Sequence, residues 1–203
     1  MRKKYEFTDE VKTVEGTVLH RIVALRDIDY PYRPVRKGDL GGFVEKEDNL
    51  SHNGGCWVFD NACVFNDARV FDNAIVCGNS CIFDSAKVYG RARVYDRVMV
   101  FNSAEVFDNS FLYDDAMAFD NSKVYGCSTI RNDAMVFEDA CVYDNALFYG
   151  DAQIFGNSRI FGNARVFDKA KVFGDACVYD NALVYGDAQI FGNFTKISKG
   201  TKE

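Results

Sequence analysis

Twenty-three consecutive six-residue units run from Cys56 to Asn193 without an insertion or a deletion, each close to Ala-x-Val-(Phe/Tyr)-(Asp/Gly)-(Asn/Asp). An uninterrupted period of this kind is typical of solenoids, in which each repeat packs only against its neighbours. It also leaves no room for the long loops on which catalytic groups are commonly carried. The period therefore indicates the architecture of this chain more strongly than its function.

The position of Val58, Val64 and Val70 recurs at every sixth residue, mostly as Val or Ile, and Ala or Ser stands two residues before it almost every time. Residues two apart on a strand share a face, so Ala and Val point one way and the aromatic residue points the other way. A short strand and a corner every six residues close into a triangular prism after about 18 residues. Three aromatic rings per turn would overpack its narrow interior, so we predict that the rings point outward.

The same pattern resembles the hexapeptide-repeat, left-handed parallel β-helix family, in which an aliphatic residue follows a small residue two positions earlier; the match covers residues 56–193. The resemblance implies an all-β fold, a single-stranded left-handed parallel β-helix of about eight coils. Members of that family include acyltransferases, γ-class carbonic anhydrases and non-enzymatic proteins, and they commonly trimerise along their prism faces. The runs Gly38-Asp-Leu-Gly-Gly-Phe-Val and Cys56-Trp-Val-Phe-Asp look more narrowly like uncharacterised bacterial and phage hexapeptide-repeat proteins, which implies no established chemistry.

Three segments follow from this pattern: an N-terminal β cap over residues 1–55, the β-helix over 56–193 and a short C-terminal tail over 194–203. In the cap, residues 18–25 read as a strand that follows a Glu15-Gly16 turn, with residues 5–11 as its hairpin partner. Gly41-Gly42 is expected to form a tight bend into the solenoid.

Sorting the outward aromatic position by a period of 18 separates the three faces of the prism, and one face carries only phenylalanine. The neighbouring outward column on that face begins with Cys and Met. Such an apolar strip is larger than monomers normally expose, so we predict a protein interface there, most simply between copies of this chain, as a trimer or a dimer. The alternative is that the rings only stabilise the coil by stacking. The predicted interface residues are Cys63, Phe65, Cys81, Phe83, Met99, Phe101, Met117, Phe119, Met135, Phe137, Phe155, Phe173 and Phe191.

The formal net charge is −6, and the repeats are acidic, which disfavours direct binding to nucleic acid. We find no signal-peptide pattern and no apolar stretch near the roughly 20 residues that span a bilayer, so we expect no membrane contact and a location in the cytoplasm of a bacterial cell. Seven cysteines at scattered repeat positions do not form a disulfide framework and are expected to be reduced thiols.

His20 and His52 are the only histidines, and both lie outside the repeats. His52 is placed one unit before Val58 in the inward column, where a capping hydrogen bond is the favoured role and a general base is the alternative. The Asp residues at the corners are interpreted as turn residues and not as metal ligands, and no cofactor is expected.

The sequence therefore favours a non-catalytic, self-associating scaffold that also has surface available for another protein. One rival is a phage-encoded inhibitor that binds a host defence protein. The other is an acyltransferase that uses acyl-CoA, which depends on the family resemblance alone.

Overall fold

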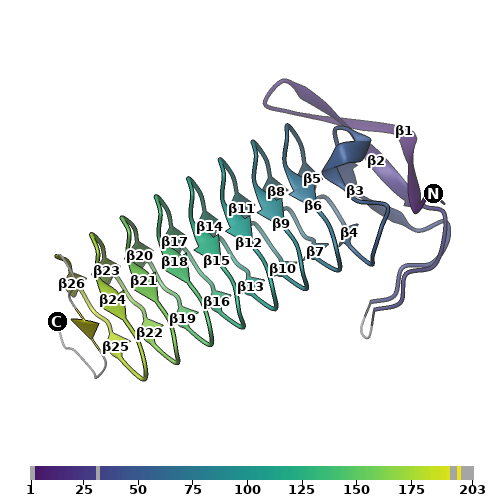
Figure 1. The fold of residues 1–203 in the computed structure, drawn as a ribbon. Coiled ribbons are helices and arrows are strands. Elements are labelled where there is room, and N and C mark those ends of the chain that lie inside the picture. Colours follow the sequence, from purple (N-terminus) through teal and green to yellow (C-terminus); the bar gives the residue numbers. More distant parts are fainter. Residues whose placement is uncertain (1–2, 31–32, 193–195, 198–203) are drawn as a thin grey trace.

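The computed structural model describes residues 3–30, 33–192 and 196–197, and it is an all-β solenoid with a small N-terminal cap (Figure 1). Two-residue strands recur along the chain and pair in parallel with the strands one turn before and one turn after, as Met99 pairs with Cys81 and with Met117. The register between regular turns is 18 residues, and there are about eight turns. The predicted fold class is confirmed in these respects.

The strands stack into three sheets, which we name by the side chains they present. The Phe face contains β5 (Cys63–Val64), β8 (Cys81–Ile82), β11 (Met99–Val100), β14 (Met117–Ala118), β17 (Met135–Val136), β20 (Gln153–Ile154), β23 (Lys171–Val172) and β26 (Gln189–Ile190). The charged face contains β6 (Arg69–Val70), β9 (Lys87–Val88), β12 (Glu105–Val106), β15 (Lys123–Val124), β18 (Cys141–Val142), β21 (Arg159–Ile160), β24 (Cys177–Val178) and β27 (Lys196–Ile197). The mixed face contains β4 (Trp57–Val58), β7 (Ile75–Val76), β10 (Arg93–Val94), β13 (Phe111–Leu112), β16 (Thr129–Ile130), β19 (Leu147–Phe148), β22 (Arg165–Val166) and β25 (Leu183–Val184).

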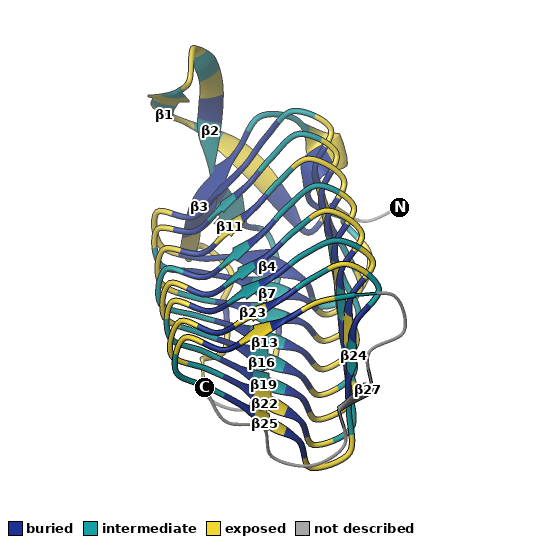
Figure 2. Ribbon diagram, turned by 90° about the vertical axis from the view of Figure 1, so that its left-hand side faces the viewer, coloured by how far each residue is buried: buried dark blue, intermediate teal, exposed yellow. Residues whose placement is uncertain are grey.

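The interior of the prism is built from the aliphatic and small positions of each unit, as predicted. Val100, Val106 and Ala104 have no exposed surface, and the same holds for nearly every equivalent position along the solenoid. Figure 2 shows these buried positions alternating with exposed corners along each turn. Phe148 is larger than the aliphatic residues at the equivalent positions, and its whole ring is buried inside the prism.

The corners require residues that tolerate a left-handed backbone. Asp96, Asp108 and Asp114 have φ between 58° and 61°, and Gly90 and Gly126 occupy the same kind of position with φ of 68° and 71°. Aspartate, asparagine and glycine adopt this conformation at the lowest cost, which explains their alternation at this position of the repeat. The role of these acids as turn residues is confirmed by their positive φ. As a separate observation, no group of three or more His, Cys, Asp or Glu side chains within the described ranges is placed to hold a metal ion.

The cap is joined to the Phe face by backbone pairing. Strands β1 (Tyr5–Val14) and β2 (Thr17–Ala24) form the predicted antiparallel hairpin, with Glu15 and Gly16 at positive φ in its turn. Strand β3 (Leu40–Val44) pairs antiparallel with β2 and parallel with β5, so the sheet of the Phe face continues without a break into the hairpin. A short 3₁₀ helix, η1 (Glu47–Asn49), follows β3.

Two expectations for the cap are wrong. Gly41 and Gly42 lie inside β3 and do not form a bend; they are glycine because a Cβ atom on Gly41 would come within 2.6 Å of Ile22 and one on Gly42 within 2.6 Å of Val58 and of Ala62. The second wrong expectation concerns His52, which was predicted to fill the position of the inward column before Val58. Leu50 occupies that position instead, and it forms a parallel bridge with Val70.

His52 therefore lies two residues beyond that column, because the first turn is longer than the regular ones. Phe43 pairs with Cys63, a register of 20 residues. Of the predicted tail over 194–203, only Lys196 and Ile197 are among the described residues, and they pair with β24.

Candidate functional site

The eight phenylalanines of the Phe face form one continuous stack on the outside of the solenoid. Ring centroids in successive turns, from Phe65 to Phe191, are 4.9 to 5.4 Å apart, and the planes differ by at most 14°. Ring planes this nearly parallel follow from the constant register, because each ring leaves the backbone at an equivalent atom one turn further on. The predicted aromatic ladder is confirmed.

The hairpin covers the first two predicted interface residues. Cys63 is fully buried and Phe65 is only 2% exposed, because both pack against Leu19 of β2 and Phe43 of β3. These two side chains therefore offer no free surface to a partner. The sequence did not indicate this, since the position of the hairpin depends on cap residues outside the repeat.

The Phe face becomes accessible at β8, where Cys81 and Phe83 still pack in part against the cluster of Leu19, Phe43, Cys63 and Phe65. We call the part that begins there the Phe/Met strip and define it as Cys81, Phe83, Met99, Phe101, Met117, Phe119, Met135 and Phe137. All of these are half-buried except Met99, which is 37% exposed. Beyond the strip the rings continue through Phe155 and Phe173, also half-buried, to Phe191, which is 62% exposed, but the neighbouring column changes to Gln153, Lys171 and Gln189. The apolar surface is thus concentrated in four successive turns.

Ring stacking alone does not distinguish this face from the charged face. Rings on the charged face, from Phe71 to Tyr179, stack at 4.7 to 5.3 Å. Their neighbours are charged, however: Lys87 and Glu105 form an ion pair at 2.9 Å, and the Tyr89 hydroxyl donates a hydrogen bond to Glu105 at 3.2 Å. Groups of this kind keep their hydration, whereas the Phe/Met strip has no charged side chain to hold water.

A pair of thiols lies where the hairpin meets the strip. Cys63 and Cys81 are direct neighbours across β5 and β8, and the Lys12 ammonium lies 3.3 Å from the Cys63 sulfur. The hydrogen bond from the Cys81 thiol, aided by Lys12, lowers the pKa of Cys63, and the same hydrogen bond together with burial raises the pKa of Cys81. The pKa values of the two neighbouring thiols are thus shifted in opposite directions, with Cys63 as the more acidic of the two. All seven cysteines are free thiols in this structure.

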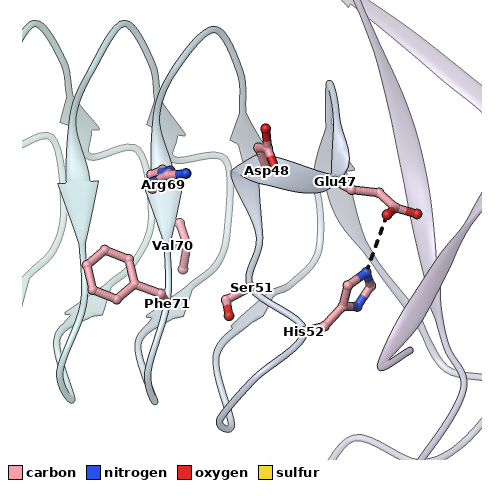
Figure 3. A pocket seen from close by; sticks show the side chains of 7 residues that line it. All are labelled: Glu47, Asp48, Ser51, His52, Arg69, Val70 and Phe71. Carbon is pink, nitrogen blue, oxygen red and sulfur yellow. Dashed lines mark ion pairs between the residues drawn. The ribbon is translucent and has the colours of Figure 1, made fainter. Parts of the chain in front are cut away.

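His52 lines an open depression between the cap and the charged face, together with Glu47, Asp48, Ser51, Arg69, Val70 and Phe71 (Figure 3). Its Nδ1 atom accepts the backbone N–H of Lys4 at 3.2 Å, and its ring stacks on Tyr5 at 4.4 Å. Its Nε2 atom faces Glu47 at 3.8 Å. The predicted capping hydrogen bond is present.

The protonation of this histidine follows from the same contacts. Burial lowers the pKa of His52 in spite of the neighbouring carboxylate, so the ring is neutral near pH 7. In the neutral ring the N–H of Lys4 occupies the lone pair of Nδ1, and the proton resides on Nε2. A general base needs a free lone pair directed at its substrate, and the described contacts leave neither nitrogen in that state.

No family model matches this sequence, and no curated protein matches it. Within the part of the chain that the structure describes, the helical content is a single 3₁₀ turn, and no helix there has the length and apolar character that crossing a membrane requires.

Proposed function

We propose that this protein acts without catalysis, as a rigid β-solenoid that associates with further copies of itself, as a dimer or a trimer, through the Phe/Met strip and offers its remaining surface to another protein. The observation that carries this proposal is the contrast between two faces of one prism. Both faces bear stacked rings, but only the Phe/Met strip combines them with uncharged sulfur-containing side chains over four successive turns. Association would remove this apolar surface from water, which is the main favourable contribution to protein–protein binding.

The rigidity of the strip favours binding for a second reason. Its backbone is hydrogen-bonded to the turns on both sides, as in the bonds from Phe101 N–H to Ala118 at 3.1 Å and from Phe83 N–H to Val100 at 3.1 Å. A surface that is already ordered loses little conformational entropy when a partner binds. The neutral, hydrogen-bonded His52 supports the non-catalytic part of the proposal, because it is the residue on which the acyltransferase alternative depends.

The test is the mass of the protein in solution, measured by light scattering after size exclusion. The wild-type chain should form a defined dimer or trimer. Phe101→Glu combined with Phe119→Glu, which places two charges in the middle of the strip, should give monomers that keep the circular dichroism of the wild type. The matched control is Phe107→Glu combined with Tyr125→Glu, two stacked rings in successive turns of the charged face; it should leave the oligomer intact.

Two results would overturn the self-association part of the proposal. The first is a wild-type chain that remains monomeric at high concentration. The second is dissociation of the control variant to the same extent as the strip variant, because that would mean that ring stacking, and not the strip, maintains the assembly.

A further inference from the structure

The mixed face has a ladder of outward rings that is interrupted twice. Its outward positions are Phe59, Cys77, Tyr95, Tyr113, Arg131, Tyr149, Phe167 and Tyr185. Tyr149 and Phe167 stack at 4.9 Å, and Phe167 and Tyr185 stack at 5.3 Å. At Arg131 a planar guanidinium lies 4.6 Å from the centre of the Tyr149 ring and takes the place of the missing ring. At Cys77 the side chain is too short to do this.

The missing ring at Cys77 coincides with a cavity. The cavity is lined by Tyr30, Arg33, Phe59, Ile75, Cys77, Arg93 and Tyr95, and its volume is about 450 Å³ including the part open to solvent. Phe59 and Tyr95 belong to positions two turns apart, so one outward position of the ladder, that of Cys77, lies between them. Tyr30, which the cap contributes, is tilted by 55° to Phe59 at 6.1 Å and forms a side wall without completing the stack.

The floor of the cavity is uncharged. Burial raises the pKa of Cys77 to about 12, so this residue remains a neutral thiol at ordinary pH. Cys77 is 7% exposed and Phe59 is 5% exposed, and Ile75 and the ring of Tyr95 complete the apolar lining. Surfaces of this type favour an aromatic ring, which stacks on its neighbours and displaces water from apolar atoms.

Two guanidinium groups lie at the cavity. Arg33 lies over the ring of Phe59 at 4.4 Å. Its guanidinium donates two hydrogen bonds to the Asp60 carboxylate, at 2.6 and 3.0 Å, so its positive charge is balanced. Arg93 lies over the ring of Phe111 at 5.2 Å, and among the ion pairs of the described residues it has no carboxylate partner. An arginine held by an aromatic face and without an acidic partner is well suited to bind a carboxylate through two parallel N–H bonds.

We propose that the vacancy at Cys77 is a binding site for a small planar aromatic carboxylate, whose ring stacks between Phe59 and Tyr95 and whose carboxylate pairs with Arg93. The aromatic lining of the cavity, with one ring of the ladder missing, favours a planar ring, and Arg93 favours the negative charge. This site is on a different face from the Phe/Met strip, so it does not depend on the proposed self-association.

The experiment is a titration of the isotope-labelled full-length protein with benzoate, followed by NMR at the amides of Cys77 and Tyr95 and at the side chain of Arg93. Benzoate should cause saturable shifts at these groups. Cyclohexanecarboxylate keeps the charge but is not planar, and benzamide keeps the ring but is uncharged. Each should bind at least about tenfold more weakly than benzoate, since each loses one of the two interactions.

Variants test the assignment. Cys77→Phe should fill the gap with a permanent ring and abolish the benzoate shifts, whereas Arg131→Phe, at the other interruption of the same ladder, should leave them unchanged. Arg93→Gln should reduce the affinity for benzoate to that for benzamide, and it keeps the proposal testable if Cys77→Phe does not fold. Absence of saturable shifts at Tyr95 and Arg93, or wild-type affinity in Arg93→Gln or in folded Cys77→Phe, would overturn the proposal.

Discussion

The side chain of Asp108 accepts a hydrogen bond from the backbone N–H of Gly126, the residue at the same corner one turn further along, with 3.2 Å between Oδ2 and N. The same bond joins Asp72 to Gly90 and Asp144 to Gly162. A corner residue thus has two tasks: it adopts a left-handed backbone, and it satisfies an N–H group that the strands of the next turn leave without a partner.

Substitution of Asp108 should separate these two tasks. Asp108→Asn keeps an acceptor and tolerates the positive φ, so it should change the free energy of unfolding by no more than about 0.5 kcal/mol. Asp108→Ala loses the acceptor and places a Cβ-bearing residue without local hydrogen bonding at φ 58°, which should cost about 1–2 kcal/mol. Chemical denaturation followed by circular dichroism measures both. Equal stability of the two variants would contradict this account of the corners.

Phe148 should contribute more to stability than any single outward ring. It is fully buried in the prism and pairs in register with Ile130 and Val166. Phe148→Ala leaves a cavity that the rigid turns close only partly, and it should cost about 3–5 kcal/mol in the same denaturation experiment. The control is Tyr149→Ala, the next residue, whose half-buried ring stacks outside on Phe167. A loss in the control as large as that in Phe148→Ala would argue against the assigned orientations.

The histidine of the cap should make stability depend on pH. Because burial lowers the pKa of folded His52, the unfolded chain binds a proton more readily than the folded one. The free energy of unfolding should therefore fall as the pH decreases from above about 6.5, the ordinary histidine value, and this contribution should level off below the folded pKa. His52→Asn keeps an acceptor for Lys4 but does not titrate, so it should lose less stability than the wild type between pH 8 and pH 5. Identical pH profiles would contradict the pKa direction.

The thiol pair beneath the hairpin should respond to Lys12. Lys12→Met removes the ammonium 3.3 Å from the Cys63 sulfur and should raise the pKa of Cys63. The ¹³Cβ chemical shift of labelled Cys63, followed against pH, reports this directly. Lys87→Met, on the charged face, is the matched control and should leave the titration of Cys63 unchanged. An unaltered Cys63 titration in Lys12→Met would show that the Cys81 thiol alone sets its pKa.

The repeat could be interpreted from sequence because its geometry is local. A period of six places Val100 inside and Phe101 outside whatever the rest of the chain does, and the corner chemistry of Asp108 follows from backbone sterics. Contacts between the cap and the repeats could not be predicted from the repeat pattern. Leu19 covers Cys63, and Tyr30 borders the cavity at Cys77, but neither position follows from a periodicity. The sequence also predicted a bend at Gly41-Gly42, because it could not reveal the close approach of Ile22 and Val58.

The constant 18-residue register also limits how a chain like this can change its length. An added unit of six residues would preserve every local preference, yet it would rotate all later residues by one third of a revolution. The phenylalanines beyond it would then continue on a neighbouring side of the prism, and the column would be cut in two. Whole revolutions are therefore the only increments that lengthen the column without splitting it, so duplicating residues 99–116 should extend the phenylalanine stack by one ring and leave both ends of the protein unaltered.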